Sequence, residues 1–249
     1  LSVCRKLTQA HPRRIWPRNM RRSCNSRAAP RVALAEMSLR ITEIFVSLQG
    51  EANTVGLPTV FVRLTGCPLR CVYCDSEYAF SGGQNLSLPA IIQAVEGFGV
   101  ARVTVTGGEP LAQAKVHTLM SQLCDRDMSV SLETSGALDV AQVDPRVVKV
   151  IDIKTPGSKE SHRNLWSNVR HLNPHDQVKF VLCDRQDYDW AIMKCDQFDL
   201  TQRAAEVLMS PSFGQLNPTD LAQWIVADRR DVRMQIQLHK LLWGDKPGY

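Results

Sequence analysis

Three cysteines lie within eight residues of the chain, at Cys67, Cys71 and Cys74, with the spacing C-x-x-x-C-x-x-C. Thiolates at this density are ligands for zinc, copper(I) and iron–sulfur clusters. The spacing also fits one face of a helix, but Gly66 and Pro68 both oppose a helix interior. We therefore expect a loop, following an apolar strand, whose thiolates converge on one metal centre.

The number of cysteines narrows the kind of centre. A structural zinc site is normally closed by four ligands, whereas a reactive metal site keeps one position open. A cluster of four irons held by three thiolates leaves one iron free. A closed zinc site remains the alternative, and a disulfide is disfavoured in what looks like an intracellular enzyme.

With an aromatic residue, Tyr73, before the last cysteine, this loop resembles that of the radical S-adenosylmethionine (SAM) superfamily. In that family three cysteines hold a [4Fe-4S] cluster, and SAM chelates the open iron. A second motif, Gly107-Gly108-Glu109-Pro110, follows a predicted strand and is similar to the family motif that holds the SAM amine. The resemblance implies SAM contacts at Tyr73, Cys74, Asp75, Gly108, Glu109, Ser135 and Lys154.

Three further features resemble one family, the 7-carboxy-7-deazaguanine synthases, over residues 39–249. They are the run 48–51, Arg63 on the next strand, and the sequence 74–76. Where that family has threonine as a magnesium ligand this chain has Ser76, which offers the same hydroxyl oxygen, and magnesium prefers such hard ligands. The implied substrate contacts are Leu48, Gln49, Gly50, Glu51, Arg63, Thr106 and His239.

The resemblance implies a radical rearrangement. A 5′-deoxyadenosyl radical from SAM would abstract hydrogen from 6-carboxy-5,6,7,8-tetrahydropterin, which would lose ammonia and become 7-carboxy-7-deazaguanine, a precursor of queuosine in tRNA. The implied cofactors are a [4Fe-4S] cluster, SAM and Mg²⁺; the implied partners are a flavodoxin- or ferredoxin-type reductant and a second copy in a homodimer. The alternatives are a glycyl-radical activating enzyme and a non-enzymatic zinc-binding module.

Charge is unevenly distributed along the 249 residues. The chain has a net charge of +5, but residues 1–36 contain nine Lys and Arg against one acid, which leaves −3 for the rest. An acidic remainder argues against direct binding of nucleic acid, and no apolar run is long enough to span a membrane. We expect residues 1–36 to be a disordered, dispensable extension, transit-like or from a misassigned start.

Residues 37–249 are expected to form the radical SAM core domain with C-terminal substrate-binding elements, in the cytoplasm. Strands are predicted from residue 38 to about 46 and at 59–64, 101–106, 129–133, 147–152, 177–183, 206–209 and 233–238. Helices are predicted at about 87–96, 111–127, 185–198 and 218–228. This alternation predicts a parallel sheet with its site after the strand ends. The resemblance implies a partial, open TIM-like barrel of about six parallel strands.

Overall fold

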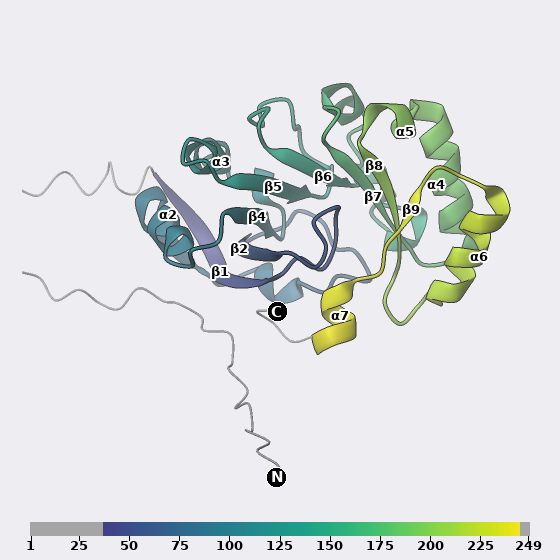
Figure 1. Ribbon diagram of the computed structural model, residues 1–249, viewed down its shortest axis with the longest axis horizontal. Helices are drawn as coiled ribbons and strands as arrows, with labels where there is room; N and C mark the ends of the chain where they lie inside the picture. The colour runs from purple at the N-terminus through teal and green to yellow at the C-terminus, as the bar shows by residue number, and fades with distance from the viewer. Residues whose placement is uncertain (1–36, 245–249) are drawn as a thin grey trace, which may run out of the picture.

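The structure, a computed structural model that describes residues 37–244, is built on one nine-stranded sheet (Figure 1). The order of strands across it is β3-β1-β2-β4-β5-β6-β7-β8-β9, with β3 and β9 at its two open edges. The strands are β1 Ser38–Leu48, β2 Pro58–Leu64, β3 Gln84–Ser87, β4 Arg102–Gly107, β5 Ser129–Thr134, β6 Val148–Asp152, β7 Gln177–Leu182, β8 Glu206–Pro211 and β9 Arg233–Met234. The open, barrel-like α/β architecture is therefore confirmed.

Neighbouring strands are parallel along the part of the sheet ordered β2-β4-β5-β6-β7-β8-β9. At the other end of the sheet, β1 pairs antiparallel with both β2 and β3. The connection 49–57 between β1 and β2 contains no helix. A parallel pair needs a long crossover, whereas a short loop returns the chain antiparallel. The expected six parallel strands are thus β2 and β4–β8, extended by the two-residue β9 and flanked by an antiparallel pair.

Helices lie outside the curved sheet (Figure 1), except the last one, α7, which lies at the cavity. They are α2 Leu88–Glu96, α3 Val116–Cys124, α4 Arg185–Phe198, α5 Leu200–Arg203, α6 Pro218–Asp228 and α7 Leu238–Trp243. Short 3₁₀ turns occur at Glu77–Ala79, Pro110–Ala112, Pro156–Ser158, Ser161–Arg163 and Trp166–His171. Side-chain caps begin the helices where polar residues allow: Ser87 accepts from the amide of Ala90 at the start of α2, and Asp184 accepts from the amide of Asp187 at the start of α4.

Three predicted elements differ from the structure. The helix expected over 111–127 is a 3₁₀ turn followed by the shorter α3, because the carboxylate of Glu109 caps the turn through the amide of Leu111. The strand expected over 233–238 is only β9, and the chain then forms α7. Strand β3 was not predicted, because its polar sequence resembles a loop and only its pairing with β1 makes it a strand.

Alternation along the strands divides the sheet into two chemically different faces. Alternate residues of the strands pack against the helices in the apolar core, such as Val105, Leu132 and Phe180. Several intervening residues line a cavity on the other face, among them Arg63, Thr106, Glu133, Asp152 and Lys179. The concave face of the sheet therefore carries a group of polar residues from neighbouring strands.

Within the described residues, no helix is long and apolar enough to cross a membrane. The predicted extension over residues 1–36 lies outside the part of the chain that the structure describes.

Candidate active site

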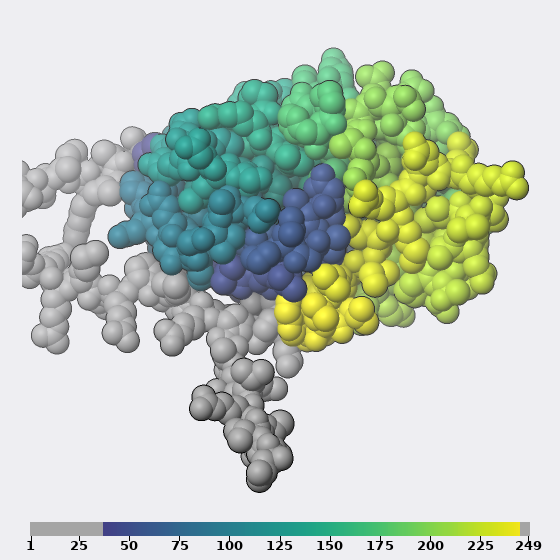
Figure 2. Space-filling view, in the orientation of Figure 1, coloured from purple at the N-terminus to yellow at the C-terminus, as the bar shows by residue number. Residues whose placement is uncertain are grey.

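A cavity of about 700 Å³ opens on the concave face of the sheet. Its wall is formed by the cysteine loop, the ends of the parallel strands and α7. Figure 2 shows the C-terminal segment, in yellow, against the dark-blue segment that follows β1. All the predicted site residues except Glu109 line it: Leu48, Gln49, Gly50, Glu51, Arg63, Cys67, Cys71, Tyr73, Cys74, Asp75, Ser76, Thr106, Gly108, Ser135, Lys154 and His239.

The cysteine loop is anchored at its base by backbone hydrogen bonds. The amide of Gly66 donates to the carbonyl of Ala79 at 2.7 Å, and the amide of Glu109 donates to the carbonyl of Gly66 at 2.8 Å. A Cβ on Gly108 would overlap the Gly66 carbonyl and lie 2.8 Å from the Cβ of Cys67. Gly108, which was predicted to contact SAM, therefore also allows the cysteine loop to pack closely against the turn after β4.

The three thiols are half-buried on the same cavity wall. Burial raises the pKa of Cys67 and raises that of Cys71 to about 11, so a metal centre must displace the thiol protons on binding. Among residues 37–244, no three His, Cys, Asp or Glu side chains are positioned to hold a metal ion together. The donor set of three soft ligands on one loop nevertheless fits an iron–sulfur cluster better than a hard cation.

Glu109, which was predicted to contact SAM, is fully buried and lies outside the residues that line the cavity. It accepts hydrogen bonds from the hydroxyl of Thr134 at 2.9 Å, the hydroxyl of Ser135 at 2.5 Å, and the amides of Ser135 and Leu111 at 2.7 and 3.0 Å. In this arrangement Glu109 orients the end of β5, while Ser135 remains on the cavity surface.

Lys154 and Tyr73, which were predicted to contact SAM, lie together at the end of β6. The ammonium of Lys154 is 3.1 Å from Asp152 and 5.8 Å from the centre of the Tyr73 ring. Within the described residues, the hydroxyl of Tyr73 and Oδ1 of Asp152 are buried without a hydrogen-bond partner. Buried polar atoms are normally paired, so these two fit a site for a polar ligand such as SAM.

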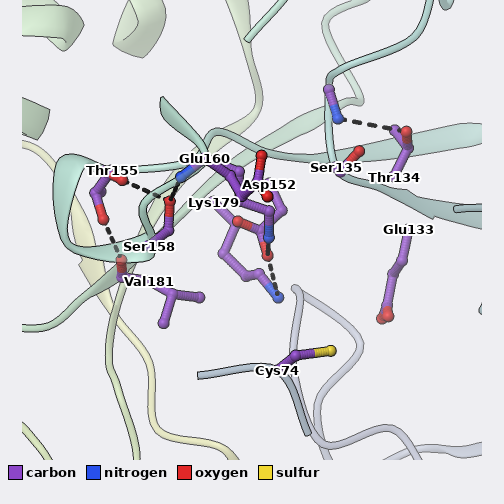
Figure 3. Close-up of polar contacts among 12 residues, drawn as sticks. Cys74, Glu133, Thr134, Ser135, Asp152, Thr155, Ser158, Glu160, Lys179 and Val181 are labelled. Atoms are coloured by element: carbon purple, nitrogen blue, oxygen red, sulfur yellow. Dashed lines mark hydrogen bonds and ion pairs between the residues drawn. The ribbon is translucent and has the colours of Figure 1, made fainter. Parts of the chain in front are cut away.

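Lys179 is a cavity residue that the sequence interpretation missed. Its ammonium pairs with Glu51 and lies 3.3 Å from Asp152. Figure 3 shows Lys179 beside Asp152. Lys179 therefore joins the predicted substrate residues to the residues around Lys154. Burial opposes ionisation of Asp152, but the ammonium groups of Lys154 and Lys179 lower its pKa overall. The available signal was a lysine between apolar residues of strand β7, because lysine is almost never buried unless it is paired.

Glu133 was also missed, and it is the acid least able to ionise in this cavity. Its carboxylate accepts from the side-chain amide of Gln49 at 3.3 Å and from the hydroxyl of Thr106 at 3.1 Å. Burial, together with the negative charge of Glu51, raises the pKa of Glu133 although Lys179 opposes the shift. The signal in the sequence was an acid at the predicted end of β5, where α/β sheets place functional groups.

Helix α7 closes the side of the cavity near Glu51. The amide of Leu238 donates to the carbonyl of Gly50 at 3.0 Å, and the Gln237 side chain donates to Glu51 at 2.7 Å. His239 occupies the space that a side chain on Gly50 would fill. Burial lowers the pKa of His239, although Glu51 lies nearby, so the imidazole is neutral at pH 7 and can both donate and accept a hydrogen bond.

Arg63 lies on β2 beside Thr106 of β4, and its Nε donates to Glu43 at 2.9 Å. Glu43 also accepts from the hydroxyl of Tyr78 at 2.7 Å. The guanidinium carbon is 5.9 Å from the centre of the Phe45 ring, which holds the plane of the group. One edge of the guanidinium is therefore fixed by protein, and the residue lines the cavity as predicted.

Ser76 and Asp75 lie where the cysteine loop ends. The hydroxyl of Ser76 lies 3.9 Å from the sulfur of Cys74. Asp75 forms an ion pair of 3.4 Å with Lys240 of α7. Burial alone would raise the pKa of Asp75, but nearby positive groups, above all Lys240, outweigh burial and lower the pKa. An ionised carboxylate and a hydroxyl at this position are hard ligands of the kind that Mg²⁺ prefers.

An open, mostly parallel sheet with a three-cysteine loop beside the ends of its strands defines the class of radical SAM proteins, and residues 61–152 match the Radical SAM superfamily. Two bacterial proteins, each named 7-carboxy-7-deazaguanine synthase, are similar to the chain. The one from Koribacter versatilis is 40% identical over 82% of this chain and 97% of its own length, and the one from Chlorobaculum tepidum 43% over 84% and 96%. The chain belongs to the 7-carboxy-7-deazaguanine synthase family.

A solved structure supports the same architecture. QueE from Escherichia coli superposes with a TM-score of 0.69 over 86% of this chain and 100% of that chain, at 21% identity. This likeness concerns the fold. Family membership, which rests on the sequence relatives, sets aside the glycyl-radical activating enzyme and the zinc-binding module as alternatives.

Proposed function

We propose that the protein is a carbon–nitrogen lyase that converts 6-carboxy-5,6,7,8-tetrahydropterin into 7-carboxy-7-deazaguanine with loss of ammonia, for queuosine precursor biosynthesis. The observation that carries this proposal is the single cavity in which the cysteine loop faces Gln49, Glu51, Arg63 and His239. A [4Fe-4S] cluster and SAM, when bound, would supply the radical chemistry. The chain itself binds, orients and shields the reactants.

The cavity divides into two parts that suit two ligands. Cys67, Cys71 and Cys74 would hold the cluster, and Lys154, Ser135 and Tyr73 are placed to receive the polar groups of SAM. Gln49, Glu133 and Thr106 offer a hydrogen-bonding surface to a flat heterocycle, and Arg63, beside Thr106 on the neighbouring strand, offers a cation to its carboxylate. A guanidinium pairs with a carboxylate through two parallel hydrogen bonds, which suits the carboxylated pterin.

Ser76 and Asp75 are proposed to hold Mg²⁺ beside the substrate carboxylate. The serine supplies the hydroxyl oxygen that threonine supplies in the family pattern. Magnesium takes one or two protein ligands and completes its shell from substrate and water. The proposal also includes a flavodoxin- or ferredoxin-type reductant, a homodimer and a cytoplasmic location.

An anaerobic assay tests this function. Reconstituted protein, supplied with SAM, a chemical reductant, Mg²⁺ and 6-carboxy-5,6,7,8-tetrahydropterin, is expected to form 7-carboxy-7-deazaguanine, identified by mass spectrometry. The protein should be brown and bind iron and sulfide, and Cys71→Ala should lose both colour and product. A colourless protein with stoichiometric zinc and no product would contradict the proposal.

A further inference from the structure

The cysteine loop is held from outside by a turn whose residues do not face the cavity. The amide of Arg70 donates to the carboxylate of Glu160 at 2.7 Å, and the amide of Val72 donates to the carbonyl of Ser158 at 3.2 Å. These amides belong to residues on either side of Cys71. Their hydrogen bonds point away from the cavity, which fixes the orientation of the peptide units that present the Cys71 thiol.

The turn is rigid because its own polar groups are paired. The hydroxyl of Ser158 is fully buried, donates to the carbonyl of Thr155 at 2.6 Å and accepts from the amide of Glu160 at 3.0 Å (Figure 3). Ser158 therefore ties the start of the turn to Glu160. The other hydroxyl of the turn, that of Thr155, lies 2.9 Å from both the carbonyl of Val181 and the carboxylate of Asp187, and it shares its one proton between these two acceptors.

A buried carboxylate anchors the turn to the sheet. Asp187, at the start of α4, accepts from the hydroxyl of Thr155 at 2.9 Å, the amide of Gly157 at 2.8 Å and the amide of Cys183 at 2.9 Å. A side chain on Gly157 would overlap this carboxylate. Hydrogen bonds therefore connect the end of β7 to the cysteine loop without passing through the cavity.

Arg70 supports the loop from its other side. Its guanidinium donates to the carbonyls of Cys67 and Leu69 at 2.8 and 2.6 Å and lies 4.2 Å from the centre of the Phe80 ring. The side chain thus bonds the loop internally while the amide of the same residue bonds Glu160. The loop is braced on two sides although its thiols remain on the cavity surface.

We propose that residues 155–160 form a brace for the cluster loop, in which Glu160 and Ser158 are positioning residues that fix the backbone around Cys71. The inference rests on the proposed function, because it assumes that the loop holds a cluster. A loop already set in its liganding shape does not lose conformational entropy when the cluster binds, so the brace slows loss of the cluster.

Glu160→Ala and Glu160→Gln separate this role from a general effect on stability. Both variants remove the charge, but glutamine keeps an oxygen that can accept from the Arg70 amide. The matched control is Glu96→Ala, which removes an exposed glutamate whose ion pair with Arg126 is far from the loop in sequence and lies at the surface. Ser158→Ala provides a second, independent break in the brace.

The measurements are made on the full-length reconstituted protein under anaerobic conditions: the rate of iron loss to a chelator, amide hydrogen exchange at Arg70 and Val72, and the midpoint of thermal unfolding. Losing a hydrogen bond to a charged acceptor should speed iron loss and exchange at Arg70 by roughly tenfold or more in Glu160→Ala. Glu160→Gln should remain close to the parent, Ser158→Ala should resemble Glu160→Ala, and Glu96→Ala should match the parent.

The brace is overturned if Glu160→Ala keeps its iron and its Arg70 amide exchanges at the parent rate. It is also overturned if Glu160→Gln loses iron as fast as Glu160→Ala, because the lost hydrogen bond would then not be the cause. Turnover of the parent protein is measured in the same preparation. An inactive parent with these rate differences would reject the proposed function and leave the brace standing.

Discussion

The guanidinium of Arg63 makes two kinds of contact. Its Nε donates a hydrogen bond to Glu43, and its other edge lines the cavity. Lysine could keep the ion pair with Glu43, but an ammonium cannot form two parallel hydrogen bonds with a carboxylate as well. We predict that Arg63→Lys weakens pterin binding roughly ten- to a hundredfold, the effect of losing one charge-assisted contact of about 1.5–3 kcal/mol. Equilibrium binding of the pterin to the reconstituted protein measures this.

Arg102→Lys is the matched control, because Arg102 is exposed at the start of β4 and outside the cavity wall. It should bind pterin like the parent. Slow cleavage of SAM without substrate should persist in Arg63→Lys, since Arg63 is not among the residues predicted to contact SAM. Unchanged pterin affinity in Arg63→Lys would remove this residue from the site.

Glu133 allows a prediction about pH and stability. Burial raises its pKa above the ordinary 4.5, so the folded state binds a proton before the unfolded chain does. Ionisation of Glu133 therefore costs stability above the raised pKa, and the cost is absent below pH 4.5. Glu133→Gln should raise the midpoint of thermal unfolding at pH 7, and the gain should shrink as the pH falls towards 4.5. A gain that is constant over this range would show that ionisation is not its cause.

Ser76 tests whether magnesium is held beside the cysteine loop. Ser76→Ala removes the hydroxyl oxygen and should raise the Mg²⁺ concentration needed for half-maximal turnover, whereas Ser76→Thr keeps the oxygen and should match the parent. A magnesium titration of turnover compares the three proteins. The same magnesium dependence in Ser76→Ala and the parent would place the metal elsewhere.

Most residues of the site could be predicted from the sequence, because the cysteines have a recognisable spacing and the polar residues follow the ends of predicted strands. Glu109 shows what that approach leaves out. Its motif predicts a contact with SAM, and the structure adds that Thr134 and Ser135, at the end of β5, bond its carboxylate. Lys179 shows the converse, since its partners Glu51 and Asp152 come from the loop after β1 and from β6. Pairing between distant segments is not visible in local sequence.

At the scale of elements, the long alternating or apolar segments were predicted and the short ones were not. Strands β5 and β7 and helix α4 agree with expectation because their pattern is strong over their whole length. Strand β3 and helix α7 depend on contacts with other segments, and α7 is held by Gly50 and Glu51. Six residues are too few for a helix to be stable without such contacts.

The turn after β4 gives a prediction at this scale. A side chain on Gly108 would overlap the cysteine loop, and overpacking a well-packed region typically costs about 1–3 kcal/mol. Gly108→Ala should therefore unfold at lower denaturant concentration and retain less iron. Gly97→Ala is the control, because Gly97 has φ of −61° and its added Cβ would meet nothing closer than 3.4 Å. Equal stability of the two variants would contradict the packing of the loop on Gly108.

At the scale of the whole molecule, the open sheet leaves its concave face free for two ligands at once. The helices cover the other face (Figure 1), and α7 returns to the cavity from the far end of the chain. The alternation of strands and helices predicted the parallel sheet, and the resemblance to the radical SAM family implied its open shape. The antiparallel pairing of β1 with β2 was not predicted, although the short connection 49–57 was a signal for it, because a parallel pair needs a longer crossover.

The most direct test of the central claim is the amount of 7-carboxy-7-deazaguanine formed for each SAM molecule consumed. In the proposed reaction SAM is regenerated, so limiting SAM with excess pterin should give many equivalents of product and little free methionine. The count is made by mass spectrometry under anaerobic conditions, with Cys71→Ala as the blank. Cleavage of SAM in the parent protein without any 7-carboxy-7-deazaguanine would contradict the account.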